Sequence, residues 1–144
     1  VAEHGRACNA MKRYVTDTQC LLWYLADDRR LPRAPARAFR DADHGNAQIL
    51  VPTIALVEVI FLAQRRRVSQ DVLARVLRLP DDPDATILVV PLDMAVVHTV
   101  ADFGPAAVPE LADRVIAATA RALNLPLLTV DHAIAQSGLV EVID

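Results

Sequence analysis

The chain has 144 residues, of which 53% are hydrophobic and 23% are charged. This size and balance fit one globular domain with a sizeable core and are too small for two. The net charge of −3 argues against a general nucleic-acid coat protein, which is normally basic, but not against an enzyme that meets phosphates through metal ions.

Residues 1–10 show no regular apolar period, whereas Met11 opens a segment that looks like a translational start. We interpret 1–10 as a tail or expression remnant and 11–144 as a single domain. No apolar stretch reaches the roughly 18 residues of a membrane span, and no secretion signal opens the chain, so we expect a cytoplasmic protein without a membrane segment. Cys8 and Cys20 form neither a CxxC pair nor a disulfide framework, so cysteine chemistry is not expected.

Short, β-branched apolar runs bounded by polar residues or proline predict four strands and allow a fifth. The four lie at 13–17, 48–52, 85–92 and 125–131, and the fifth at 139–143. Helical patterns lie between them, at 18–26, 35–43, 53–67, 70–79, 93–103 and 110–124, and 80–84 forms a loop. Strands that are apolar throughout are typical of a parallel sheet covered on both faces. The alternation therefore predicts an α/β three-layer sandwich with a central parallel sheet of about four or five strands.

Four acidic residues fall where an open parallel sheet binds its ligands, beyond the carboxyl ends of the strands. Asp17 ends the first strand and Asp131 ends the fourth. Glu58 lies one to two turns into the helix after the second strand, and Asp113 opens the helix that leads into the fourth. Taken singly, Asp17, Asp113 and Asp131 could each be a helix cap or an acidic first turn.

Glu58 is harder to explain as a structural residue because it stands in the apolar stretch IALVEVIFLA, residues 54–63. No Lys or Arg lies within a turn of it, so a buried carboxylate there needs another partner. A divalent cation would supply that partner and relieve repulsion among the carboxylates. Oxygen ligands favour Mg²⁺ or Mn²⁺ over zinc, and the four histidines lack metal-ligand spacing.

This acidic set predicts nuclease chemistry. Mg²⁺ held by a few carboxylates keeps bound waters, one of which can attack a phosphodiester in line. Four carboxylates suit either one ion or two. No Gly-rich phosphate loop and no GxSxG motif is present, so nucleoside triphosphate binding and α/β-hydrolase chemistry are unsupported.

Three segments also carry a resemblance to a known family: YVTDTQCLLWYL around Asp17, LVEVIFLAQ around Glu58, and ELADRVIAATARALNLPLLTVD from Glu110 to Asp131. Together they resemble the PIN domain, and more narrowly a VapC-type toxin, over nearly the whole chain from Met11 onward. The resemblance implies a PIN-like sandwich and an endoribonuclease that is restrained by a small antitoxin and tends to form homodimers.

The same resemblance assigns residues. It implies that Asp17, Glu58, Asp113 and Asp131 bind Mg²⁺ or Mn²⁺ and that Thr129, the hydroxyl residue before the fourth acid, orients that acid by a hydrogen bond. Val130 stands where the family usually has a small residue.

Two other functions stay open. A non-catalytic PIN-like module could bind RNA or a protein without cutting it. An aspartate-based phosphatase or phosphoacceptor would also use Asp17 with Mg²⁺. A phosphatase of that type needs a second acid two residues later, where this chain has Gln19, and a phosphoacceptor needs a lysine near a late strand end, whereas the only lysine is Lys12.

The arginine triplet 65–67 either ends its helix as solvated positive charge or contacts RNA phosphates.

Overall fold

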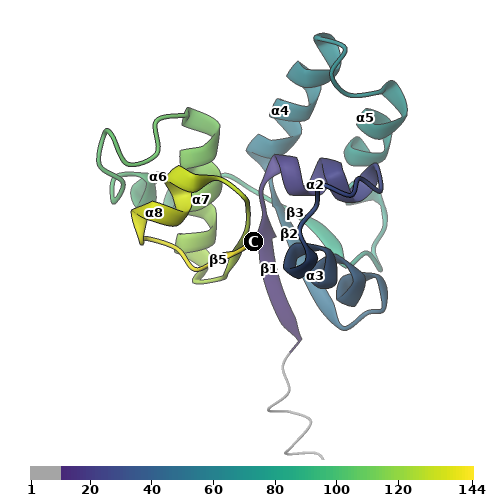
Figure 1. The fold of residues 1–144 in the computed structure, drawn as a ribbon, viewed down its shortest axis with the longest axis horizontal. Helices are drawn as coiled ribbons and strands as arrows, with labels where there is room; N and C mark the ends of the chain where they lie inside the picture. Colours follow the sequence, from purple (N-terminus) through teal and green to yellow (C-terminus); the bar gives the residue numbers. More distant parts are fainter. Residues whose placement is uncertain (1–10) are drawn as a thin grey trace, which may run out of the picture.

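In the computed structural model, which describes residues 11–144, five parallel strands form one sheet with helices against both of its faces (Figure 1). The strand order is β3-β2-β1-β4-β5. The strands are β1 (Lys12–Thr16), β2 (Ala47–Pro52), β3 (Ile87–Val90), β4 (Leu127–Leu128) and β5 (Val142–Ile143). The predicted three-layer sandwich with a parallel sheet is confirmed. The tail expected at residues 1–10 lies outside the described residues.

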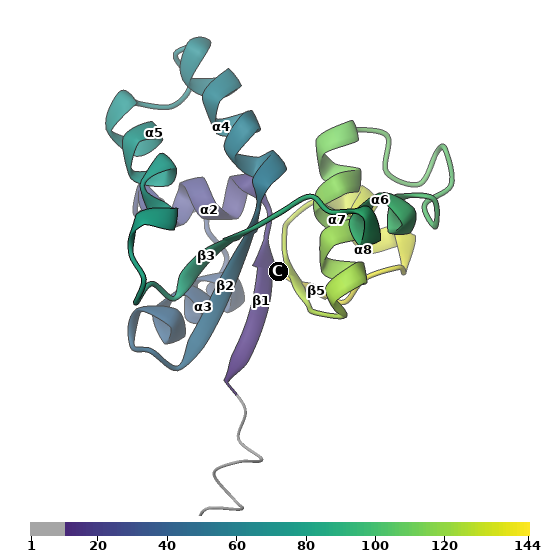
Figure 2. The same ribbon diagram turned by 180° about the vertical axis from the view of Figure 1, so that it is seen from behind.

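The helices divide into two groups, one on each face of the sheet, as the views from front and back show (Figures 1 and 2). The first group comprises α2 (Thr18–Leu25), α3 (Arg33–Asp43), α4 (Thr53–Gln64) and α5 (Gln70–Leu77). The second comprises α6 (Met94–Val100), α7 (Leu111–Leu123) and α8 (His132–Ser137), and a short 3-10 helix, η1 (Leu79–Asp81), precedes β3. Among the described helices, none is both long and apolar enough to cross a membrane.

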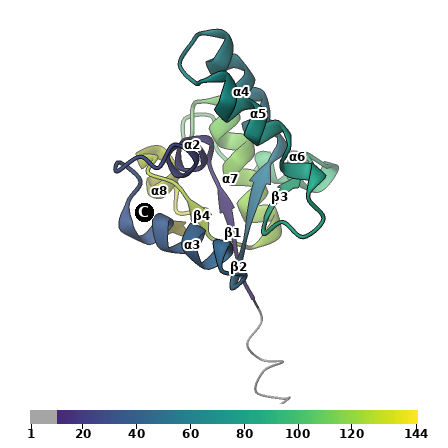
Figure 3. The same ribbon diagram turned by 90° about the vertical axis from the view of Figure 1, so that its right-hand side faces the viewer.

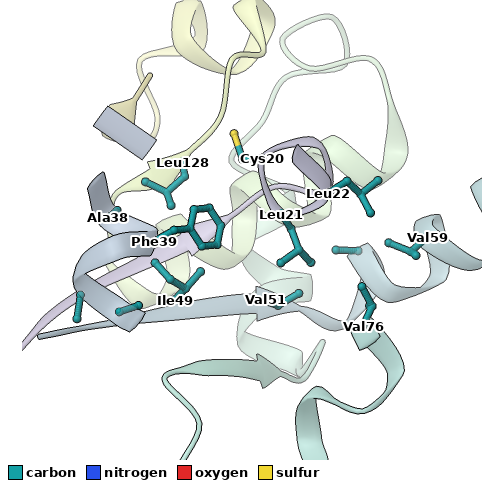
Figure 4. Close-up of a cluster of buried hydrophobic side chains, with 13 residues drawn as sticks. Cys20, Leu21, Leu22, Ala38, Phe39, Ile49, Val51, Val59, Val76 and Leu128 are labelled. Carbon is teal, nitrogen blue, oxygen red and sulfur yellow. The ribbon is translucent and has the colours of Figure 1, made fainter. Parts of the chain in front are cut away.

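Residues of β2 alternate between two cores. Ile49 and Val51 point into the core beneath α2, α3, α4 and α5, whereas Leu50 points into the core beneath α6, α7 and α8. In the first core, fully buried Phe39 from α3 lies with Ile49 and Leu128 (Figure 4). Burying a side chain of this size stabilises the fold by roughly 1.5–3 kcal/mol. Burial on both faces explains why β2 is apolar throughout.

The predicted bounds are too wide at several elements, among them β3 (predicted 85–92), β5 (predicted 139–143) and α6 (predicted 93–103). Three further differences have a clear physical reason. β4 contains only Leu127 and Leu128, not the whole of 125–131, because Pro126 has no N–H and Asp131 already caps a helix. That helix, α8, was not predicted because six residues are too few to show a helical period. α4 ends at Gln64 and not at 67, because Arg66 adopts a left-handed conformation with φ 60°.

The order in which strands are added to the sheet reverses at β1. From β1 the chain adds β2 and β3 on one side, and it later adds β4 and β5 on the other. Beyond the paired residues, the backbone N–H of Asp17 still donates to the carbonyl oxygen of Leu128 at 3.0 Å. The crevice between the carboxyl ends of β1 and β4 is therefore the place where this class of fold binds ligands. On the same side, α4 and α5 extend beyond the strand ends (Figure 3).

Candidate metal centre

Asp17 follows β1 directly and is fixed by hydrogen bonds to both carboxylate oxygens. Oδ1 accepts the backbone N–H of Cys20 at 2.8 Å, which makes Asp17 the N-cap of α2. Oδ2 accepts the hydroxyl of Thr129 at 2.6 Å. Each oxygen retains a further lone pair, so this nearly buried carboxylate is held in place without being saturated.

Thr129 connects the ends of β1 and β4, in a different way from the one predicted. Its hydroxyl donates to the carboxylate of Asp17, and its oxygen accepts the backbone N–H of Asp131 at 3.1 Å. The side chain of Asp131 instead caps α8, with Oδ1 accepting the N–H of Ile134 at 2.9 Å. Thr129 thus orients the first acid through its carboxylate and the fourth acid only through its backbone.

Glu58 is only half-buried, contrary to the burial that its apolar neighbours suggested. The buried stripe of α4 consists of Ala55, Val59 and Ala63, while Phe61 is 57% exposed. Glu58 lies beside that stripe, and its Oε1 accepts the hydroxyl of Thr18 at 2.5 Å. A neutral hydroxyl therefore supplies its partner within the described residues.

All four predicted acids line one cleft of about 300 Å³. They come from the end of β1, the second turn of α4, the first turn of α7 and the start of α8. The residues that line the cleft are Asp17, Thr18, Gln19, Leu22, Glu58, Leu62, Asp113, Val130 and Asp131. No histidine or cysteine is among them, so the donors on offer are oxygen atoms.

Burial and mutual repulsion raise the pKa of three of these acids. Burial, then the charges of Asp131, Glu58 and Asp17, raise the pKa of Asp113 to about 7. Burial also raises the pKa of Glu58, as do the charges of Asp17 and Glu110, against the opposing hydrogen bond from Thr18. For Asp17, burial raises the pKa more than its hydrogen bonds lower it. Ionising the whole set without a counter-charge is therefore costly.

A cation of the Mg²⁺ or Mn²⁺ type fits this donor set, because it favours the ionised carboxylates and prefers oxygen ligands. The acids nonetheless share the cleft without converging on one point. Within residues 11–144, no three His, Cys, Asp or Glu side chains form a ready ligand group.

The nearest arginine in the sequence does not neutralise the acids. Arg114 follows Asp113, but its guanidinium donates to backbone carbonyl oxygens of the loop before α7: Gly104 at 2.8 Å, Pro105 at 2.6 Å, and Val108. It ties the loop to α7 and leaves the negative charge of the cleft uncompensated.

The sequence interpretation missed Thr18 and Gln19, which line the cleft beside Asp17. Their position directly after the first acid was the available signal. Gln19 stands where a phosphatase would need its second acid, and Lys12 begins β1, at the far end of that strand from Asp17. The geometry therefore gives no support to the phosphatase or phosphoacceptor alternative.

Comparison with solved structures finds toxin–antitoxin proteins of the same fold. DNA-bound VapBC from Salmonella typhimurium has a TM-score of 0.69 at 16% identity, covering 93% of this chain and 98% of that chain. VapBC2 from Rickettsia felis, bound to a promoter DNA fragment, has a TM-score of 0.68 at 12% identity and covers 91% and 97%. VapC20 from Mycobacterium tuberculosis, described as a Sarcin-Ricin loop cleaving toxin, has a TM-score of 0.66 at 14% identity and covers 91% and 99%.

At these identities the likeness establishes a shared fold. A search of curated protein sequences gives no match. The sequence model of the PIN domain, however, matches residues 14–138, which include every acid of the cleft. This match covers most of the chain, and the chain therefore belongs to the PIN domain family.

Proposed function

We propose that this protein is a Mg²⁺- or Mn²⁺-dependent endoribonuclease and the toxin of a toxin–antitoxin pair. The observation that carries the proposal is the meeting of Asp17, Glu58, Asp113 and Asp131 in one cleft between the carboxyl ends of β1 and β4. Membership of the PIN domain family, whose VapC-type members are nucleases, supports hydrolysis of phosphodiester bonds as the reaction class.

In this proposal the four acids are the cation ligands, and each has a distinct support. The side chain of Asp17 is oriented by hydrogen bonds from Thr129 and Cys20, and that of Asp131 by its hydrogen bond to the first turn of α8. Glu58 is directed by Thr18. The pKa of Asp113 is raised to about 7, so this acid is partly protonated near neutral pH and would release that proton when a cation binds. A bound cation supplies a polarised water for in-line attack on the phosphodiester.

The partners are proposed from the structural neighbours and from exposed apolar residues. One solved structure of the same fold is a toxin-antitoxin complex from Klebsiella pneumoniae, and VapC20 is described as a Sarcin-Ricin loop cleaving toxin. We therefore propose an RNA substrate, a small antitoxin and a cytoplasmic location. Val57 and Phe61 on α4 and Met94 on α6 are apolar and exposed, which supports a homodimer as the working form.

The test is RNA cleavage with Mg²⁺ or Mn²⁺ by wild type, Asp17→Asn and Asp113→Asn. Asparagine keeps the capping oxygen of residue 17 but removes its charge. Asp81→Asn is the matched control, because Asp81 is exposed in η1, outside the cleft. We expect both cleft variants to lose cleavage and the control to retain it. Equal cleavage by all four proteins would remove these acids from the chemistry.

The separation of the acids favours one alternative, a PIN-like module that binds RNA or a protein without cutting. Calorimetric titration with Mn²⁺ distinguishes the two functions. The nuclease binds Mn²⁺ and loses this binding in Asp113→Asn, whereas the binding module takes up no Mn²⁺ and still binds its macromolecular partner.

A further inference from the structure

The acidic cleft adjoins the first of two further hollows in the surface. Gln19, Leu22 and Leu62 line the cleft and also line a second hollow of about 380 Å³ between α2 and the turn that joins α4 to α5. Arg67, Val68 and Ser69 in turn line both this hollow and a third, of about 470 Å³. We call the two hollows beyond the cleft the α2 groove. The shared lining residues place the three hollows in series, which is the arrangement that a polymer with one unit in the cleft needs.

The middle of the α2 groove combines apolar and polar side chains and contains the only tryptophan of the chain, Trp23. Its walls include Leu22, Leu62 and Val72. The indole Nε1 of Trp23 is buried and has no hydrogen-bond partner within residues 11–144. The guanidinium of Arg30 lies 5.5 Å from the centre of the indole ring. The guanidinium covers one face of the ring, so a base would meet the Arg30–Trp23 pair and the neighbouring apolar side chains, and every base offers a π surface to such groups.

The far end of the α2 groove is positively charged. Arg67 lines both of its hollows and Arg66 lines the outer one, and no acid lines that outer hollow. In the inner hollow, the one acid, Asp28, is paired with Arg30 at 2.7 Å. Neither Arg66 nor Arg67 forms an ion pair with another described residue. This end therefore complements a polyanion better than a neutral or acidic peptide.

The turn that presents these arginines is strained. The N–H of Arg67 donates to the carbonyl oxygen of Leu62 at 2.8 Å and that of Arg66 to Ala63 at 3.0 Å, the paired bonds of a Schellman motif. Arg66 occupies the left-handed position, φ 60°, where glycine is normal. Backbone strain of this sort is often retained at functional sites. Arg65, in the same triplet, lines none of the three hollows.

We propose that the α2 groove binds a single-stranded segment of the RNA substrate next to the phosphodiester in the cleft. Arg67 holds a backbone phosphate, with Arg66 adding positive charge beside it. Trp23, Leu22 and Leu62 receive bases from the strand between that phosphate and the cleft. Arg67 is thus a positioning residue. The proposal rests on the proposed function for the identity of the bound polymer as RNA substrate.

The test measures binding without cleavage. The fluorescence of Trp23 reports directly on the α2 groove, since the chain has no second tryptophan. All proteins carry Asp113→Asn, which lowers the negative charge of the cleft, and all titrations are done in EDTA. A single-stranded oligoribonucleotide of about eight residues is added to this background, to Arg67→Ala and to Arg65→Ala at several salt concentrations. Arg65→Ala removes the same charge from the same triplet but outside the groove.

We expect the oligoribonucleotide to change Trp23 emission. Arg67→Ala should weaken binding and reduce the slope of log affinity against log salt by about 0.7, the value for one phosphate contact on a single strand. Arg65→Ala should leave both unchanged. Equal losses in the two variants would mean general charge attraction and would overturn the assignment of Arg67.

Unchanged Trp23 emission at every salt concentration would overturn the groove itself, whether or not the wild type cleaves RNA. If a co-expressed antitoxin changed that emission while RNA did not, the groove would belong to the protein partner. Conversely, groove binding by a wild type that never cleaves would support this inference and reject the nuclease.

Discussion

The hydroxyl of Thr129 donates a 2.6 Å hydrogen bond to Oδ2 of Asp17, a residue 112 positions away in the chain. Its oxygen also accepts the backbone N–H of Asp131. One side chain thus joins the ends of β1 and β4 where the sheet reverses. Because Asp17 is only 6% exposed, this bond replaces water that the carboxylate cannot reach.

Thr129→Val removes that donor while keeping the shape of the side chain. We expect the free energy of unfolding to fall by about 1.5–3 kcal/mol, the range for a hydrogen bond to a charged group. The pKa of Asp17 should rise further, since the bond from Thr129 lowers it, and Mn²⁺ should bind more weakly. Urea unfolding and calorimetry measure the two effects. Thr129→Ser keeps the hydroxyl and should restore Mn²⁺ binding, although it loses some stability with the buried methyl group. A Val variant like wild type would contradict the assigned role.

Without a divalent cation, the free energy of unfolding should decrease as the pH rises from about 4 to about 7. Asp113 has its pKa raised from 3.8 to about 7, so in this window the folded protein binds more protons than the unfolded chain. Stability is therefore greatest on the acid side and is lost as pH rises through the window. For a half-exposed carboxyl we expect roughly 1–2 kcal/mol after solvent screening.

Urea unfolding in EDTA across this pH range measures the effect. Asp113→Asn should remove this contribution, and saturating Mg²⁺ should offset the loss at neutral pH by binding the folded state. A wild type and an Asp113→Asn variant with the same pH profile would contradict the prediction.

Glu58→Gln should separate cation binding from folding. The amide oxygen of glutamine can still accept the hydroxyl of Thr18, and the change removes one negative charge from the cleft. We expect Mn²⁺ binding and cleavage to be lost while the thermal midpoint stays equal or rises. Calorimetry and thermal unfolding in EDTA check the two parts. A variant that unfolds would return Glu58 to a structural role.

Arg114→Ala should loosen the loop before α7. The guanidinium donates to the carbonyl oxygens of Phe103, Gly104, Pro105 and Val108, and alanine leaves all of them without that donor. We expect a loss of about 2 kcal/mol in the free energy of unfolding and faster amide exchange between 101 and 110. Arg40→Ala is the control, because Arg40 is an exposed arginine in α3, away from this loop. If exchange in the loop were unchanged, Arg114 would not be its anchor.

Arg66→Gly should stabilise the protein by about 1 kcal/mol, because glycine adopts the left-handed conformation without strain. Gln64→Gly, two residues earlier in the last helical residue of α4, should destabilise it by a similar amount. Thermal unfolding of both variants measures the difference. A destabilised Arg66→Gly would indicate that the turn is not strained by its arginine.

The part of the site that could be predicted from the sequence consists of the acids at the ends of strands. Asp17 and Asp131 close recognisable apolar runs, and a parallel sheet brings such positions to one edge, so their shared cleft could be expected from the sequence. The pairing of Thr18 with Glu58 could not, because it joins residues 40 positions apart through the angle between α2 and α4. No spacing rule in one element encodes that angle.

The burial of Glu58 was predicted too strongly for a related reason. Hydropathy cannot distinguish a buried apolar side chain from an exposed one on the same helix. Ala55, Val59 and Ala63 face the core, whereas Val57 and Phe61 face outward. Only the packing of α4 against its neighbours decides which stripe is covered.

Two of the four acids cap helices and two do not, which decides which of them can be replaced without loss of folding. Asp17 and Asp131 start α2 and α8, so replacing either with alanine should damage folding and chemistry together. Glu58 and Asp113 cap nothing and can be neutralised without unravelling a helix. Folded but inactive protein, suitable for trapping an uncut substrate or a natural inhibitor, should therefore be sought at positions 58 and 113.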